Sequence, residues 1–154
     1  MEKSRIALLV IAIIAALGCL GFMGVRAFCD NVYKSRDCDF ANIDNIEMHS
    51  GIDIPEITDC DCRYDDREMA KKVTFTLNTN TVDMQAYAAD NHFQKFEIDQ
   101  PLHQSLAFAA DLPKTDRNRL YYRSNEEFIK PGKDLYRMVL NPETGKLWIY
   151  LQYN

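Results

Sequence analysis

Residues 135–153, LYRMVLNPETGKLWIYLQY, contain the clearest structural signal in the chain. Residues 135–140 and 146–153 both alternate apolar side chains with others, and the residues between them, NPETG, have the composition of a turn. Pro142 suits the second position of a type I turn, and Gly145 suits the left-handed residue that follows it in a bulged hairpin. The stretch therefore predicts a C-terminal β-hairpin.

Several segments upstream of this hairpin extend the expected sheet. Residues 71–78 (KKVTFTLN) alternate apolar and polar side chains, which is typical of a half-buried strand. Weaker strands are expected at residues 52–57, where Pro55 indicates an edge, and at residues 120–123. Residues 97–119 predict either a short helix or a buried loop.

A helix is expected to follow residues 71–78. Asn80 suits the N-cap position, and Asp83 three residues later completes a pattern similar to a capping box. The apolar stripe of this helix consists of Val82, Ala86, Ala89, Phe93 and Phe96. The order strand, strand, helix, strand, hairpin predicts an α+β domain, in which one main helix packs on a face of a small antiparallel sheet.

Residues 6–25, IALLVIAIIAALGCLGFMGV, are 20 consecutive positions without a charge. A helix of that length is about 30 Å long, which matches the hydrocarbon thickness of a bilayer. Three interpretations are open: an uncleaved signal anchor, a signal peptide cleaved after Ala27, and a lipoprotein signal with lipidation at Cys19. The last rests on residues 16–19 (ALGC), which resemble a bacterial lipobox with its first two residues exchanged.

The apolar segment divides the chain into a signal anchor or signal peptide (1–25), a membrane-proximal stalk (26–50) and the α+β domain (51–154). Only five residues precede the apolar segment, which is the form of an export signal. Four of the five cysteines lie after it, as expected for an oxidising compartment. We therefore expect the domain outside the cytoplasm. The lack of N-glycosylation acceptors favours the periplasmic side of a bacterial inner membrane.

The cysteines that follow the apolar segment are Cys29, Cys38, Cys60 and Cys62. One interpretation pairs the first two crosswise with the last two, in disulfides that hold the stalk against the first strand. The other uses Cys60 and Cys62, which share one face of an extended segment, as a metal or redox site. The chain has no C-x-x-C pair and no histidine beside these two residues, which favours the disulfides.

Composition and motifs exclude several classes of protein. The net charge is −5 and basic residues do not cluster, which argues against a nucleic-acid-binding protein. No second apolar run is long enough to span a membrane. The chain contains no phosphate-binding glycine loop, serine nucleophile elbow or H-E-x-x-H motif, and its histidines at 49, 92 and 103 are scattered. We predict no catalytic site and no cofactor.

The last three expected strands are rich in tyrosine, tryptophan and arginine. If the leucines and the isoleucine of residues 147–151 face the helix, Trp148 and Tyr150 face the opposite side of the sheet. Exposed aromatic residues beside arginine are enriched in protein-binding surfaces. The expected binding residues are Tyr121, Arg123, Arg137, Trp148 and Tyr150. The alternative is that the stalk or residues 97–119 cover this face and that its aromatic residues belong to the core.

Together these features favour a non-enzymatic, membrane-tethered binding module that recognises a protein partner outside the cytoplasm. In a bacterial envelope its expected role is that of an immunity-type or accessory inhibitor protein. Two other hypotheses remain open: a thiol-based metal-binding or redox protein that uses Cys60 and Cys62, and a small envelope hydrolase.

Overall fold

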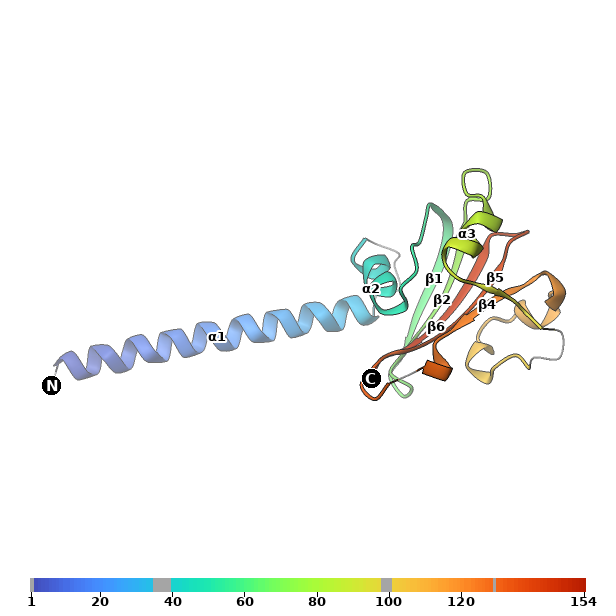
Figure 1. Cartoon of the computed structure of the whole chain (residues 1–154). Coiled ribbons are helices and arrows are strands. Elements are labelled where there is room, and N and C mark those ends of the chain that lie inside the picture. Colours follow the sequence, from blue (N-terminus) through green and yellow to red (C-terminus); the bar gives the residue numbers. More distant parts are fainter. Residues whose placement is uncertain (1, 35–39, 98–100, 129) are drawn as a thin grey trace. The chain divides into compact units, whose positions relative to one another are not determined.

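The computed structural model describes residues 2–34, 40–97, 101–128 and 130–154 (Figure 1). The chain forms two compact units, Met1–Tyr33 and Lys34–Asn154. The helix α1 (Glu2–Lys34) forms the first unit and ends at the first residue of the second. Its stretch Leu9–Val32, 24 residues near the N-terminus, is long and apolar enough to cross a membrane. The prediction of one candidate membrane-spanning helix is therefore confirmed, and the helix continues beyond residue 25.

The second unit is built on a six-stranded antiparallel sheet with the order β1-β2-β6-β5-β4-β3. The strands are β1 (Ile57–Asp65), β2 (Ala70–Leu77), β3 (Gln94–Lys95), β4 (Tyr121–Ser124), β5 (Leu135–Asn141) and β6 (Lys146–Gln152). The predicted C-terminal hairpin is formed by β5 and β6, which pair from Leu135 with Gln152 to Asn141 with Lys146. The α+β fold class is therefore confirmed.

Gly145 ends the hairpin turn in a conformation that a residue with a side chain adopts only under strain. Its φ is +69°, and a Cβ atom at this position would lie 2.5 Å from the carbonyl oxygen of Leu77. The close approach of Gly145 to Leu77 allows a main-chain hydrogen bond, which the Leu77 amide donates to the Gly145 carbonyl at 2.9 Å. The turn thus connects the hairpin directly to the end of β2.

Two helices pack on one side of the sheet, which we call the helix face (Figure 1). They are α2 (Phe40–Ser50), which contributes Ile46, and α3 (Met84–Asp90), which contributes Met84, Tyr87 and Ala88. The sheet residues of this layer alternate along their strands and are Val73, Phe75, Leu77, Met138, Leu140, Leu147, Ile149 and Leu151. Residues 40–50, expected in a membrane-proximal stalk, instead form a helix of the domain.

The helix predicted after β2 is shorter than expected and buries a different stripe. Its N-cap is Asp83, whose carboxylate accepts hydrogen bonds from the amides of Gln85 and Ala86 at 3.0 and 3.1 Å. Asn80 lies in the preceding turn, so the predicted N-cap is wrong. The shift of three residues turns Ala86 and Ala89 towards solvent.

The end of α3 sets the direction of β3. The amides of His92 and Phe93 donate to the carbonyls of Ala89 and Ala88, and His92 has a φ of +57°. This is the hydrogen-bond pattern of a Schellman motif, in which a left-handed residue terminates the helix. Because the helix ends here, Phe93 is buried on the helix face from a position outside the helix.

The opposite side of the sheet, which we call the strap face, is covered by residues 101–119, the strap. The strap contains three short 3₁₀ helices, η1 (Gln104–Leu106), η2 (Leu112–Lys114) and η3 (Arg117–Arg119). Its side chains Leu106, Ala109 and Leu112 form a second buried cluster with Val139, Trp148 and Tyr150 of the sheet. Of the two predictions for this segment, a short helix and a buried loop, the buried loop is the closer one, and the 3₁₀ turns within it were not predicted.

Candidate functional site

The aromatic residues of β6 belong to the core. Trp148 is 1% exposed and Tyr150 is 4% exposed, because the strap supplies the apolar side chains that cover them. The predicted exposed aromatic face is therefore wrong, and the alternative, in which residues 97–119 cover it, is correct for the described residues 101–119. The alternation of the strand correctly predicted that both side chains lie on the face of the sheet opposite the helices. It did not reveal which segment packs on that face.

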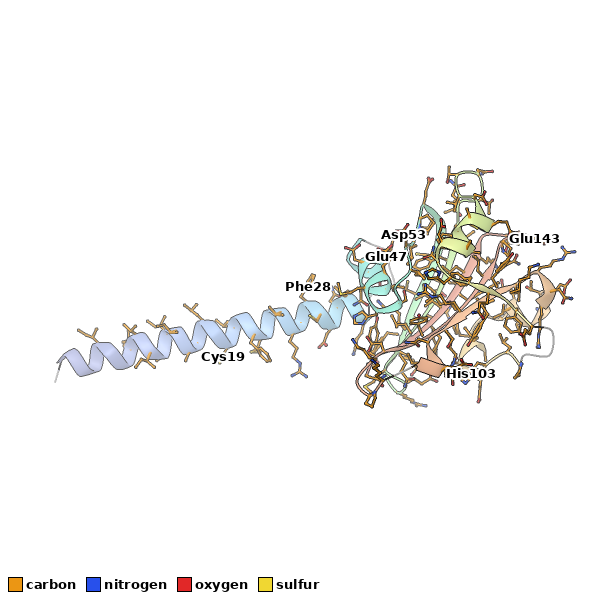
Figure 2. The ribbon with its side chains drawn as sticks, in the orientation of Figure 1. Cys19, Phe28, Glu47, Asp53, His103 and Glu143 are labelled. Atoms are coloured by element: carbon orange, nitrogen blue, oxygen red, sulfur yellow. The ribbon has the colours of Figure 1, made fainter. Side chains whose placement is uncertain are left out.

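Two ion pairs fasten the strap to the hairpin. Lys146 donates to the carboxylate of Asp111, and the Arg119 guanidinium contacts both carboxylate oxygens of Glu143 at 2.9 Å. Glu143 lies at the end of the hairpin in Figure 2. Burial is the largest single influence on Asp111 and opposes its ionisation, but the hydrogen bond and charge of Lys146 together with further hydrogen bonds outweigh it, so the pKa of the Asp111 carboxyl lies below its ordinary value. Both ion pairs and apolar packing therefore hold the strap against the sheet.

The five predicted binding residues lie on both faces of the sheet. Tyr121 and Arg123 pair with residues of the helix face, whereas Arg137, Trp148 and Tyr150 lie on the strap face. The Tyr121 hydroxyl donates to Gln85 of α3 at 2.7 Å. Arg123 donates to the Gly51 carbonyl at 3.1 Å, and its guanidinium lies 5.3 Å from the centre of the Tyr136 ring. The structure therefore does not bring these residues together as one surface.

Arg137 is a buried cation with a carboxylate partner that the sequence did not identify. Its side chain is 6% exposed, and its Nη2 and Nε atoms contact the two oxygens of Glu126 at 2.7 and 3.0 Å. Glu126 belongs to the turn η4 (Glu126–Phe128), whose first amide donates to the Ser124 hydroxyl. The hydrogen bonds from Arg137 hold the pKa of the Glu126 carboxyl below its ordinary value. Glu126 is therefore a fixed negative charge near neutral pH.

A polar cavity of about 480 Å³, which we call the edge pocket, lies beside Glu126 at the β3–β4 edge of the sheet. It includes Arg123, the one predicted binding residue that lines it. The lining residues are His92, Gln94, Lys95, Glu97, Tyr122, Arg123, Ser124, Glu126 and Glu127. Both signs of charge are present, so the pocket suits a ligand that itself carries both signs.

The strand pairing directs main-chain groups of β4 towards this pocket. β3 pairs with β4 at only two positions, Gln94 with Tyr122 and Lys95 with Tyr121, and the Phe96 amide donates to the Leu120 carbonyl at 2.9 Å. In an antiparallel ladder every second residue points its amide and carbonyl to the same neighbour. Leu120, Tyr122 and Ser124 therefore point theirs to the β3 side. No described residue of β3 lies opposite Ser124, because the chain turns at His92.

The other edge of the sheet, β1, is protected by charged side chains. Asp59 and Arg63 are exposed, and Arg63 contacts Asp61 at 2.8 Å. Charged side chains along an edge strand discourage the addition of another strand. Of the two edges, the one beside β3 and β4 is therefore the better candidate for recognition.

The cysteines form fewer bridges than expected. Cys60 is disulfide-bonded, while Cys19, Cys29 and Cys62 are thiols. Cys38 lies outside the described residues. The predicted crosswise pair of disulfides is therefore wrong, since it required Cys62 to form a bridge. Cys62 is fully buried in the core of the helix face, where it contributes to packing.

No metal site is evident within the described ranges, where no three histidine, cysteine or carboxylate side chains gather in a way that could hold an ion. Among the described residues, the close pair of a histidine and a carboxylate holds α2 against the C-terminal part of the domain. His49 of α2 bonds Asp134 through Nδ1, and its ring lies edge-on to Tyr153 at 5.1 Å. The nearby Ser50 hydroxyl is buried and donates to the Ile46 carbonyl at 2.6 Å, which directs it into its own helix.

The candidate site is thus the edge pocket, in which only Arg123 was identified from the sequence. Lys95, Glu126 and Glu127 come together through the pairing of β3 with β4 and through the turn that follows β4. The chain matches no protein-family model, no curated protein and no solved structure in the comparisons made.

Proposed function

We propose that the chain is a membrane-tethered binding module whose domain lies outside the cytoplasm and recognises a protein partner through the edge pocket. The single observation that carries the proposal is the pocket itself, a polar cavity at the β3–β4 edge that is lined by charged side chains of both signs. Such convergence of fixed charges favours specific association. An immunity-type or accessory inhibitor in a bacterial envelope is the role that we expect of such a module.

The helix α1 is the observation that supports a membrane tether. Its Leu9–Val32 stretch would extend about 36 Å at 1.5 Å per residue, which is enough to cross the hydrocarbon core with some tilt. The disulfide at Cys60 supports a location in an oxidising compartment, since such bonds are rare in the cytosol. Both observations are compatible with retention of the domain at the outer side of a membrane.

The charges of the edge pocket support recognition better than catalysis. A general acid or base works best when its pKa is near the ambient pH. The pKa of Glu126 is instead lowered by Arg137, and Arg123 is engaged with Gly51 and Tyr136. These groups offer fixed charges in fixed positions, which is what an interface requires.

The proposal is tested by placing a photocrosslinking amino acid at single positions of the full chain in its native membrane. Lys95 and Glu127 line the edge pocket, and Lys114 is an exposed control on the strap. We expect the first two positions to crosslink to the same protein and the control to give no such adduct. Adducts of equal yield at all three positions, or none at Lys95 and Glu127, would overturn the proposal.

A further inference from the structure

We propose that the strap is a lid that opens as one unit about its base, while the rest of the domain stays folded, and thereby uncovers Trp148 and Tyr150. Opening concerns the strap face of β5 and β6 and does not depend on recognition at the edge pocket. Three features of the structure support it: the main-chain hydrogen bonds of the strap, the side chains that hold the strap on the sheet, and an unpaired donor beneath it.

The strap forms its main-chain hydrogen bonds within itself. The amides of Leu106, Ala109 and Leu112 each donate to the carbonyl three residues earlier, at 3.0, 3.1 and 3.0 Å. Within the described ranges, no main-chain hydrogen bond joins residues 101–119 to a strand of the sheet. The strap can therefore leave the sheet without breaking its own turns or the ladders of the sheet, and no main-chain group loses its partner.

The base of the strap is closed by the sheet. The Phe96 amide donates to the Leu120 carbonyl at 2.9 Å, at the next position along from the pairing of Lys95 with Tyr121. The chain thus departs from β3 and returns to β4 at adjacent positions. A loop whose two ends are fixed together in this way has a single attachment, about which it can move as a hinged unit.

Among the described residues, only side chains hold the strap on the sheet. The apolar side chains that it buries most fully are Leu106, Ala109 and Leu112. Its two ion pairs, Lys146 with Asp111 and Arg119 with Glu143, involve side chains that are between 38% and 57% exposed. Ion pairs at this exposure stabilise a fold little and are screened by salt. The strap is therefore held more weakly than the hydrogen-bonded strands beneath it.

The closed strap leaves a buried donor unpaired. The Nε1–H of Trp148 has no hydrogen-bond partner among the described residues, although the side chain is 1% exposed. The Asp111 carboxylate is nearby, since Trp148 contributes to the lowering of its pKa, but no hydrogen bond of normal geometry joins the two groups. An unpaired buried donor destabilises the state that buries it. Opening of the strap returns this donor to water and so removes part of its own cost.

Opening uncovers a surface with a distinct composition. Trp148 and Tyr150 lose their cover, and the guanidinium of Arg137 lies 6.0 Å from the centre of the Tyr150 ring. Arg137 keeps its two bonds to Glu126, because only its longest contact, at 3.4 Å, is with Ser105 of the strap. Tryptophan, tyrosine and arginine are enriched in protein-binding hot spots. The closed strap is thus an autoinhibitory cover over a surface of that composition.

Hydrogen exchange of the full chain in detergent tests the lid. Mass spectrometry follows the backbone amides, and NMR follows the Nε1–H of the single tryptophan. After correction for intrinsic rates, we expect the strap amides and the Trp148 Nε1–H to report one common opening. It should be at least about tenfold more frequent than the opening that releases the amides between β5 and β6.

Two results would overturn the proposal. If the strap, the indole and the β5–β6 hairpin all exchange through one opening, the strap leaves the sheet only on global unfolding. If the strap amides exchange fast while the Trp148 Nε1–H exchanges only with the hairpin, the strap frays without uncovering the indole.

Two substitutions separate the lid from the rest of the core. Ile149→Val removes a methyl group on the helix face, so we expect about fivefold faster exchange of the hairpin amides and unchanged exchange of the strap amides and the Trp148 Nε1–H. Leu106→Ala removes an anchor of the strap and should accelerate the strap amides and the indole by at least about 30-fold. Equal acceleration of all three groups by Ile149→Val would contradict a separate opening of the strap, as would an unchanged strap and indole in Leu106→Ala.

Discussion

At the scale of single residues, the pair formed by Arg137 and Glu126 determines how the edge pocket is built. A guanidinium keeps its charge in any protein environment, so its burial on the strap face requires a partner. Glu126 supplies two charge-assisted hydrogen bonds, and the Ser105 hydroxyl of the strap accepts a longer one at 3.4 Å. One buried cation therefore connects the strap, the sheet and the turn that carries the acidic side of the pocket.

We predict that Glu126→Gln lowers the free energy of unfolding at pH 7 by about 1 kcal/mol, an estimate reduced because Glu126 is half-exposed and screened by water. The pKa of Glu126 is lowered from 4.5, so the ion pair stabilises the fold above that value and the contribution disappears as the pH falls through the lower folded pKa. Denaturant unfolding of both proteins from pH 7 to pH 3 measures the difference.

The neighbouring substitution Glu127→Gln is the control, since this side chain is exposed. It should change the free energy of unfolding by less than about 0.5 kcal/mol at pH 7. A difference between wild type and Glu126→Gln that stays constant down to pH 3 would contradict a role for the Glu126 carboxylate in holding Arg137.

At the scale of elements, the strands β2, β4, β5 and β6 and the presence of a helix after β2 were predictable, whereas β1, β3 and the helix α2 were not. The burial of β2 alternates along the strand, whereas β5 and β6 are short runs buried on both faces that flank a turn with Pro142 and Gly145, so local patterns are sufficient to identify all three. The helix α2 buries two polar residues, Asn42 and Ser50, and therefore has no clear apolar stripe. Asn42 accepts a hydrogen bond from the buried Lys71 of β2, a contact between distant positions that no local pattern reveals.

The cover formed by the strap was predicted only as one of two alternatives, and the edge pocket was missed, for the same physical reason. The strap consists of 3₁₀ turns, which have no long helical or strand period, so the sequence alone could not decide whether it covers Trp148. The edge pocket arises where β3 stops pairing with β4, and this depends on the φ of His92 and on strand register. Both features result from tertiary pairing, whereas sequence patterns report local periodicity.

Because the strap covers the single tryptophan, Trp148, we can predict its fluorescence emission spectrum. Because Trp148 is buried beside Leu106 and Leu112, its emission should be blue-shifted and poorly quenched by acrylamide in the native protein. Unfolding in guanidinium should shift the emission to the red and restore quenching. Emission of the folded protein at the wavelength of a solvated indole would contradict the buried position of Trp148.

The position of α2 in the domain is tested by a pair of substitutions on that helix. Ile46 is 0% exposed, so Ile46→Ala should lower the free energy of unfolding by about 2–5 kcal/mol. Met48 is 78% exposed, and Met48→Ala should change it by less than about 0.5 kcal/mol. Equilibrium denaturation provides both values. If the two substitutions have equally small effects, α2 is not part of the folded domain.

At the scale of the whole molecule, a helix that is long and apolar enough to cross a membrane precedes a domain with a polar pocket at its sheet edge. A tethered module of the proposed kind would meet its partner in the thin layer next to the membrane, where the effective concentration of both is high. Even a modest affinity of the edge pocket would then be sufficient for the proposed function. The proposed function therefore requires retention of the apolar helix and an oxidising location of the domain.

The most direct test uses the chain taken from its native membrane, denatured and alkylated without a reductant. Its intact mass shows which residues are present, and peptide mapping after proteolysis shows which cysteines are alkylated. We expect a chain of all 154 residues in which Cys60 is not alkylated and Cys62 is. A mass that lacks residues 1–27, or one that lacks residues 1–18 and carries a lipid on Cys19, would contradict the membrane-spanning tether. Alkylation of all five cysteines would contradict a domain outside the cytoplasm.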